Sequence, residues 1–107
     1  MIRSATSTYD QDRATEILEQ IYLGRIERSI IEYLVDRFGR STPTVSLVNA
    51  AYGDDPNGGP DNAGNVIKAH VLHLNRKLRP YGLRIVHDGT GSRKLIFDMD
   101  LKGPASL

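Results

Sequence analysis

The sequence predicts an α+β domain that is mainly α-helical, with a three-helix core, a C-terminal β-hairpin and an extra N-terminal helix. Apolar residues recur at helical spacing in four segments, and two β-prone runs, 83–87 and 92–97, follow them. With 107 residues, 39% of them hydrophobic and 25% charged, the chain has the size of one domain. We expect that domain to span residues 13–98, between a flexible N-terminus, 1–12, and a flexible tail, 99–107.

The first two helices are each predicted by apolar residues that recur on one face. The first follows an N-cap at Asp10 or Asp12 and ends before Gly24, and the second ends at Gly39. The apolar residues are Ala14, Ile17, Leu18 and Ile21 in the first helix, and Ile26, Ile30, Tyr33, Leu34 and Phe38 in the second. We expect the stripe of the first helix to pack on the core of its own domain, with a dimer interface as the alternative.

The third and fourth helices are separated by a loop rich in glycine, proline, asparagine and aspartate. In residues 41–43, Ser-Thr-Pro, a hydroxyl cap stands directly before a proline, which predicts the start of a third helix that ends near Tyr52. Residues 54–62 form the loop. The fourth helix, 62–79, is predicted from apolar residues spaced by four, three and four positions, because this spacing keeps them on one face. These residues are Ile67, Val71, Leu74 and Leu78.

A β-hairpin follows the fourth helix. Pro80 and Gly82 end the helix, and the strands 83–87 and 92–97 are joined by residues 88–91, whose glycines allow the positive φ of a tight turn. Three helices followed by a hairpin is the order of a winged helix-turn-helix domain.

Positive charge is concentrated on the fourth helix and the hairpin. Residues 62–94 carry seven basic residues against one acidic residue, a net charge of +6, whereas the whole chain carries +1. The remaining residues therefore sum to −5, so the charge is strongly asymmetric. This segregation predicts a polyanion as the partner of the basic segment.

Four stretches of the sequence, in their order and spacing, resemble the DNA-binding domain of response regulators of the OmpR/PhoB type. They are 23–34 (LGRIERSIIEYL), 48–55 (VNAAYGDD), 69–78 (AHVLHLNRKL) and 89–95 (GTGSRKL). The resemblance implies a winged helix-turn-helix that binds double-stranded DNA, with a recognition helix, 62–79, in the major groove and a wing, 83–97, on the adjacent minor groove.

The chain departs from this family in two respects. Leu23 lies near the start of the chain, so we expect neither a receiver domain nor phosphorelay control. The family also has a four-stranded sheet before its first helix, whereas the corresponding residues here have a helical period, so we expect a helix in its place.

The exposed face of the fourth helix supplies the candidate residues for reading bases. With the apolar stripe buried, Lys68 can reach guanine O6 or N7, and Ala69 or Leu72 can contact a thymine methyl. The resemblance matches Lys68, Ala69 and His73 to positions that face bases. We expect His70 to be half-buried and bonded to a backbone group, outside the site. The residues expected at phosphates or in the wing are Thr42, Thr44, Tyr52, Asn65, Arg76, Lys77, Arg79, Thr90, Arg93 and Lys94.

Other classes of function are disfavoured by the residues present. The chain has no cysteine, and His70 and His73 lack a third ligand nearby in the sequence, so we expect neither a metal nor a cofactor. No constellation of nucleophile and base predicts an enzyme. No apolar run approaches the roughly 18 residues of a membrane span, and we expect a cytoplasmic protein with no membrane partner that is nucleoid-associated when bound to DNA.

These patterns favour sequence-specific binding of double-stranded DNA by a transcriptional regulator of bacterial or phage type. A domain of this size reads few base pairs, so we expect a homodimer or tandem copies on DNA. The alternative is a winged-helix protein-protein interaction module that does not bind DNA. The small net charge of the chain, together with Leu72 and His73 on the recognition face, would suit a protein partner.

Overall fold

Four helices and a small antiparallel sheet make up the described part of the computed structural model, which covers residues 2–89 and 91–98, with side chains from residue 9 onward. The helices are α1 (Ile2–Leu18), α2 (Arg25–Asp36), α3 (Thr44–Tyr52) and α4 (Ala63–Leu78), followed by a short 3-10 helix, η1 (Arg79–Tyr81). The strands are β1 (Thr42–Pro43), β2 (Leu83–His87) and β3 (Ser92–Phe97). The predicted α+β, mainly helical class is confirmed, and the hairpin strands have the predicted bounds.

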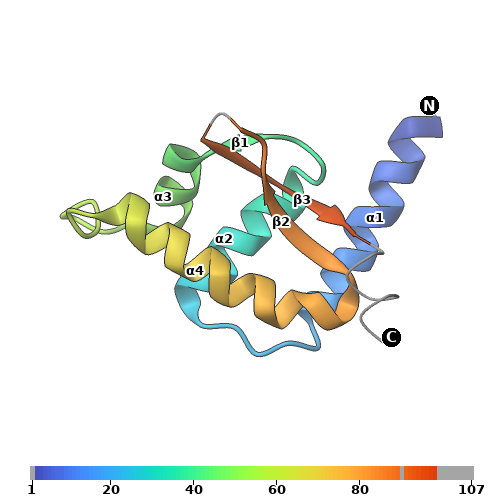
Figure 1. The fold of residues 1–107 in the computed structure, drawn as a ribbon, viewed down its shortest axis with the longest axis horizontal. Coiled ribbons are helices and arrows are strands. Elements are labelled where there is room, and N and C mark those ends of the chain that lie inside the picture. Colours follow the sequence, from blue (N-terminus) through green and yellow to red (C-terminus); the bar gives the residue numbers. More distant parts are fainter. Residues whose placement is uncertain (1, 90, 99–107) are drawn as a thin grey trace.

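The sheet has the order β1-β3-β2, so that β3 lies between its two neighbours (Figure 1). Thr42 of β1 pairs with Arg93, and β2 pairs with β3 along its whole length. Gly89 and Gly91 in the hairpin turn have φ values of 90° and 82°, as predicted. The turn lies at the end of the molecule that carries α3, and α1 lies at the opposite end (Figure 1).

The core is built around the apolar stripe of α4. Its four predicted residues are all buried, and they pack with residues of the other three helices and of both hairpin strands. The stripe of α1 is part of this core, since Ala14, Ile17 and Leu18 are buried, which confirms that it packs on its own domain. Each large apolar side chain buried in this way stabilises the fold by about 1.5–3 kcal/mol relative to exposure. The core members of α4 are Ile67, Val71, Leu74 and Leu78.

The first helix is longer than predicted. It begins at Ile2, so the N-cap predicted at Asp10 or Asp12 is wrong, and residues 2–12, expected as a flexible N-terminus, form its first turns. No glycine or proline interrupts this stretch, so the helix can continue beyond its apolar stripe.

Gln11 joins α1 to the end of α2. Its Nε2 donates hydrogen bonds to the carbonyl oxygens of Val35 (3.1 Å) and Asp36 (3.0 Å). The last carbonyl groups of a helix have no following helical turn whose N–H groups could donate to them. The Gln11 side chain therefore caps the C-terminus of α2.

The start of α3 differs from the prediction. α3 begins at Thr44 with Pro43 as its N-cap, whereas the sequence predicted a hydroxyl cap immediately before Pro43. Thr42 is instead fully buried in β1, where its Oγ1 accepts a hydrogen bond from Nε of Arg37 (3.1 Å). A two-residue strand has too little periodicity to be recognised in a sequence, and pairing with β3 decides its conformation.

Asn75 joins α4 to the free edge of β2. Its Nδ2 donates to the carbonyl oxygen of Ile85 (3.1 Å), and its Oδ1 accepts from the N–H of the same residue (2.8 Å). The side-chain amide thus takes the place of a further strand at an edge that would otherwise leave backbone groups unpaired. This pair of hydrogen bonds holds the hairpin against α4 and sets where it stands relative to the exposed face of that helix.

We predict that Asn75→Ala lowers the free energy of unfolding by about 1–3 kcal/mol, because both backbone groups of Ile85 lose their partners. The measurement is urea unfolding followed by circular dichroism. Asn65→Ala is the control, since it is the same substitution at an exposed position in the first turn of the same helix. Equal effects of the two substitutions would contradict the role of Asn75.

Candidate nucleic-acid interface

One face of α4 remains exposed after its apolar stripe is buried, and it carries all four residues predicted to read bases. Leu72 is 60% exposed although it is large and apolar, and the His73 side chain is 59% exposed. The spacing of three and four residues aligns the exposed positions in one stripe along the helix. These positions are Asn65, Lys68, Ala69, Leu72, His73 and Arg76.

A groove of about 540 Å³ separates this face from the hairpin. Lys68 and Leu72 line it from α4, and Arg84, His87 and Arg93 line it from the strands. Arg84 and His87 were not among the predicted site residues. The alternation of side chains along β2 is the signal that could have found Arg84, because residues between buried strand positions point outward.

Arg93 and Lys94, both predicted to contact DNA from the wing, lie on opposite faces of β3, and burial of the Arg93 side chain disfavours that contact for Arg93. Successive side chains of a strand point to opposite faces. Arg93 is only 6% exposed, and its Nη1 donates a hydrogen bond to Oγ1 of Thr44 (2.9 Å). Arg93 therefore ties β3 to the start of α3, whereas half-buried Lys94 remains available for a phosphate.

The threonines predicted to contact phosphate at the start of α3 are used inside the protein. Thr44 donates its hydroxyl to the carbonyl oxygen of Gly91 (2.8 Å) and accepts the bond from Arg93. Thr42 is fully buried. The predicted phosphate contact is wrong for Thr42, whose side chain is out of reach, whereas that of half-buried Thr44, whose hydroxyl already has protein partners, stays a prediction. Thr90, predicted at the tip of the wing, lies outside the described residues.

Lys77 was predicted to bind a phosphate, and its ammonium is bound within the protein. Its Nζ lies 2.8 Å from Oε1 of Glu27, donates to the carbonyl oxygen of Tyr22 (3.1 Å) and lies 5.8 Å from the centroid of the Tyr22 ring. The ammonium therefore already has protein partners, and the phosphate contact of Lys77 stays a prediction.

Glu27 is a buried acid beneath the exposed face of α4, with its side chain 10% exposed. Burial by itself raises the pKa of Glu27, but hydrogen bonds from Lys77 and the N–H of Gly24, with the positive charges of Lys77 and His70, lower it below the ordinary value. The second carboxylate oxygen, Oε2, lies 4.0 Å from Nδ1 of His73. Glu27 is therefore an ionised group directly behind a predicted base-reading side chain.

His70 is half-buried, as predicted. The predicted bond to a backbone group is wrong for Nδ1, which has no hydrogen-bond partner within residues 9–89 and 91–98.

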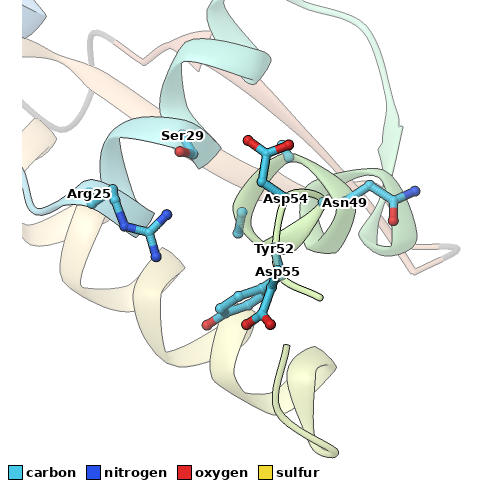
Figure 2. A pocket seen from close by; sticks show the side chains of 9 residues that line it. Arg25, Ser29, Asn49, Tyr52, Asp54 and Asp55 are labelled. Atoms are coloured by element: carbon cyan, nitrogen blue, oxygen red, sulfur yellow. The ribbon is translucent and has the colours of Figure 1, made fainter. Parts of the chain in front are cut away.

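Tyr52 lines a hollow of about 400 Å³ between α2 and the end of α3 (Figure 2). Arg25 lies on the α2 side of this hollow, and Asp54 and Asp55 lie on the loop side (Figure 2). The hollow thus holds one cation and two carboxylates, and the predicted contact of Tyr52 with the DNA backbone stays a prediction.

The ring of Tyr52 has a structural role in the loop between α3 and α4. It lies against Gly59, where φ is +89° and an added Cβ would stand 2.7 Å from Cγ of the ring. Only glycine suits this position, because any side chain would meet both a strained backbone and the ring. Tyr52 therefore anchors the loop that leads into α4.

The available cations surround the exposed face of α4. Lys68, Arg76 and Arg79 are exposed, and no ion pair engages them within the described part of the chain. Arg84, 49% exposed, shares its charge with Asp98 at 3.3 Å. The whole of α4 contains no acidic residue. The exposed face of α4 therefore carries cations, one large apolar side chain and one imidazole. Because no carboxylate of α4 lies on this face, α4 itself does not repel a polyanion that approaches it.

Other kinds of site are not built by the described residues. Over residues 9–89 and 91–98 no three His, Asp or Glu side chains gather as metal ligands. Over the same part of the chain, no helix combines the length and the apolar character needed to cross a membrane.

Comparison of the sequence with models of known protein families finds no match, and comparison with curated proteins finds no significant match.

We predict that the stability of the protein depends on pH through Glu27. Because its pKa is lowered from 4.5 in the folded state, the stabilisation is present above pH 4.5 and is lost as the pH falls through the folded-state pKa. Glu27→Gln cannot titrate, so its unfolding free energy should fall less than that of the wild type between about pH 6 and about pH 3. Urea unfolding at a series of pH values measures both curves, and parallel curves would rule out this contribution.

Proposed function

We propose that this chain is a winged helix-turn-helix protein that binds double-stranded DNA sequence-specifically, as a transcriptional regulator of bacterial or phage type. The observation that carries the proposal is the exposed face of α4, which combines cations, Leu72 and His73 with no acidic residue and stands beside a β-hairpin. The order of helices and strands supports it, as does the resemblance of residues 23–97 to the DNA-binding domain of OmpR/PhoB-type regulators.

In this proposal α4 enters the major groove, which is about 12 Å wide and admits one helix. Lys68 donates to guanine O6 or N7, and Leu72 or Ala69 contacts a thymine methyl. His73 follows Lys68 by five residues and so reads a different base. The side chains of this stripe are exposed to solvent, as those of a helix that enters a groove must be.

The flanking cations hold phosphates and contribute affinity rather than sequence preference. Arg76 and Arg79 lie near the end of α4, and Asn65 lies near its start. The hairpin acts as the wing on the adjacent minor groove, with Lys94 on its outer face. Arg84 and His87 line the groove between the wing and α4. There they can contact the phosphates of a DNA strand that passes between the wing and the helix.

A single domain with one reading helix covers few base pairs, so we propose that two copies bind together as a homodimer or in tandem on DNA.

One observation favours a second candidate, a protein-interaction module of the same fold. Leu72 is 60% exposed at the middle of the α4 face, and an exposed large apolar residue is typical of a protein interface as well as of a thymine contact. A module of this kind would bind no duplex at any salt concentration.

We predict that the protein shifts a random-sequence duplex in a mobility assay and that affinity falls steeply as salt is raised. With about four phosphate contacts, the slope of log affinity against log salt should be about −3 to −4, because each neutralised phosphate releases counterions. Absence of binding even at low salt would sink the DNA proposal and leave the protein-interaction module.

We predict that substitutions distinguish the residues that read bases from those that bind phosphates. Arg76→Ala weakens binding to all sequences and makes the salt slope shallower by about one, whereas Lys68→Ala or His73→Ala changes the sequences selected from a random duplex pool. Arg28→Ala is the matched control, because Arg28 lies on α2 in an ion pair with Glu32, on the surface between α1 and α2. A uniform loss of affinity from Lys68→Ala would refute its reading role.

A further inference from the structure

His73 and Glu27 meet across the boundary between the exposed face of α4 and the core. The His73 ring is 59% exposed, but its Nδ1 points toward the protein, 4.0 Å from Oε2 of Glu27. One end of the imidazole therefore faces a carboxylate, and the other end, Nε2, is the atom that a ligand on this face can reach.

The Glu27 carboxylate is held in place by two donors on its other oxygen. Oε1 lies 2.8 Å from Nζ of Lys77 and 3.5 Å from the backbone N of Gly24, at the start of α2. The carboxylate is 10% exposed, and its pKa is lowered, so it is an anion with a fixed orientation. Oε2 is consequently presented to His73 as a charged acceptor.

A neutral imidazole carries one proton, and its position decides what the other nitrogen can do. A carboxylate beside Nδ1 favours the form with the proton on Nδ1, which leaves Nε2 as a hydrogen-bond acceptor. In the major groove only the N6 amino group of adenine and the N4 amino group of cytosine are donors, whereas guanine and thymine offer acceptors at their edges.

We propose that Glu27 is a positioning residue that makes His73 a hydrogen-bond acceptor, so that the α4 face selects adenine or cytosine at the base that His73 reads. The choice of base rests on the proposed function, but the effect of Glu27 on the ring belongs to the free protein. A residue that does not touch DNA thus determines part of its sequence preference.

Glu27→Gln tests this because it replaces the anion at Oε2, which lies 4.0 Å from Nδ1 and acts through its charge rather than through a hydrogen bond, with an amide NH₂ group that can only donate. Lys77 and the Gly24 N–H can only donate, so they keep the carbonyl oxygen of the glutamine at the position of Oε1. The amide NH₂ then replaces Oε2 and donates toward Nδ1 of His73. The variant should place the ring proton on Nε2 and convert His73 from an acceptor to a donor.

The first measurement is the long-range ¹H–¹⁵N spectrum of the histidine rings in the free protein at pH 8. The wild type should show His73 protonated at Nδ1, and Glu27→Gln should show it protonated at Nε2. Protonation of His73 at Nε2 in the wild type overturns the proposal, and that result needs no variant to be folded. Lys77→Gln is the control, because it removes the positive charge of the same pair but keeps an amide donor for Oε1 and a carboxylate facing His73, and it should keep the wild-type form.

The second measurement is selection from a random duplex pool at pH 8. The wild type should prefer adenine or cytosine at the position lost in His73→Ala, and Glu27→Gln should shift that preference toward guanine or thymine by about tenfold. An unchanged preference overturns the role of Glu27 in base selection. Failure of the wild type to bind any duplex overturns the proposed function instead, and the ring spectra still decide whether Glu27 positions His73.

Discussion

The burial of one apolar face of α4 is the constraint on which the rest of the molecule depends. Ile67, Val71, Leu74 and Leu78 join the core that the other three helices and both hairpin strands share. A helix has fixed angular spacing, so burial of these positions forces the residues between them to face solvent. The exposure of the cations, Leu72 and His73 is therefore a consequence of packing, which fixes the backbone positions from which these side chains project.

Polar contacts then set what surrounds that helix. Asn75 fixes the hairpin against α4 through the backbone of Ile85, and Arg93 ties the hairpin to the start of α3. On the other side, Glu27 and Lys77 join α2 to α4 and bring a buried anion behind the exposed face. In the sequence these side chains cannot be told from solvent-exposed groups. The candidate site therefore has fewer free cations than the composition suggests.

Much of this arrangement could be predicted from the sequence, because periodicity is a local property. The α4 stripe, the hairpin strands and the exposure of the predicted base-reading residues all follow from spacing. The sequence does not reveal the contacts in which a side chain or strand meets a partner distant along the chain. Lys77 meets Glu27 fifty positions away, Thr42 joins a strand fifty-one positions away, and neither pairing leaves a local pattern. Arg93 is different, since strand alternation with buried Leu95 would have placed it inward.

The central claim is that the exposed face of α4, with the hairpin beside it, is the surface that meets DNA. Backbone amide chemical shifts of the ¹⁵N-labelled protein, recorded while a duplex is added, test this most directly. The account predicts that the amides shifted by the duplex are those of α4 and the hairpin strands, while those of α1 and of the hollow lined by Asp54 and Asp55 stay in place. Shifts confined to α1 or to that hollow, or no shifts at low salt, would contradict it.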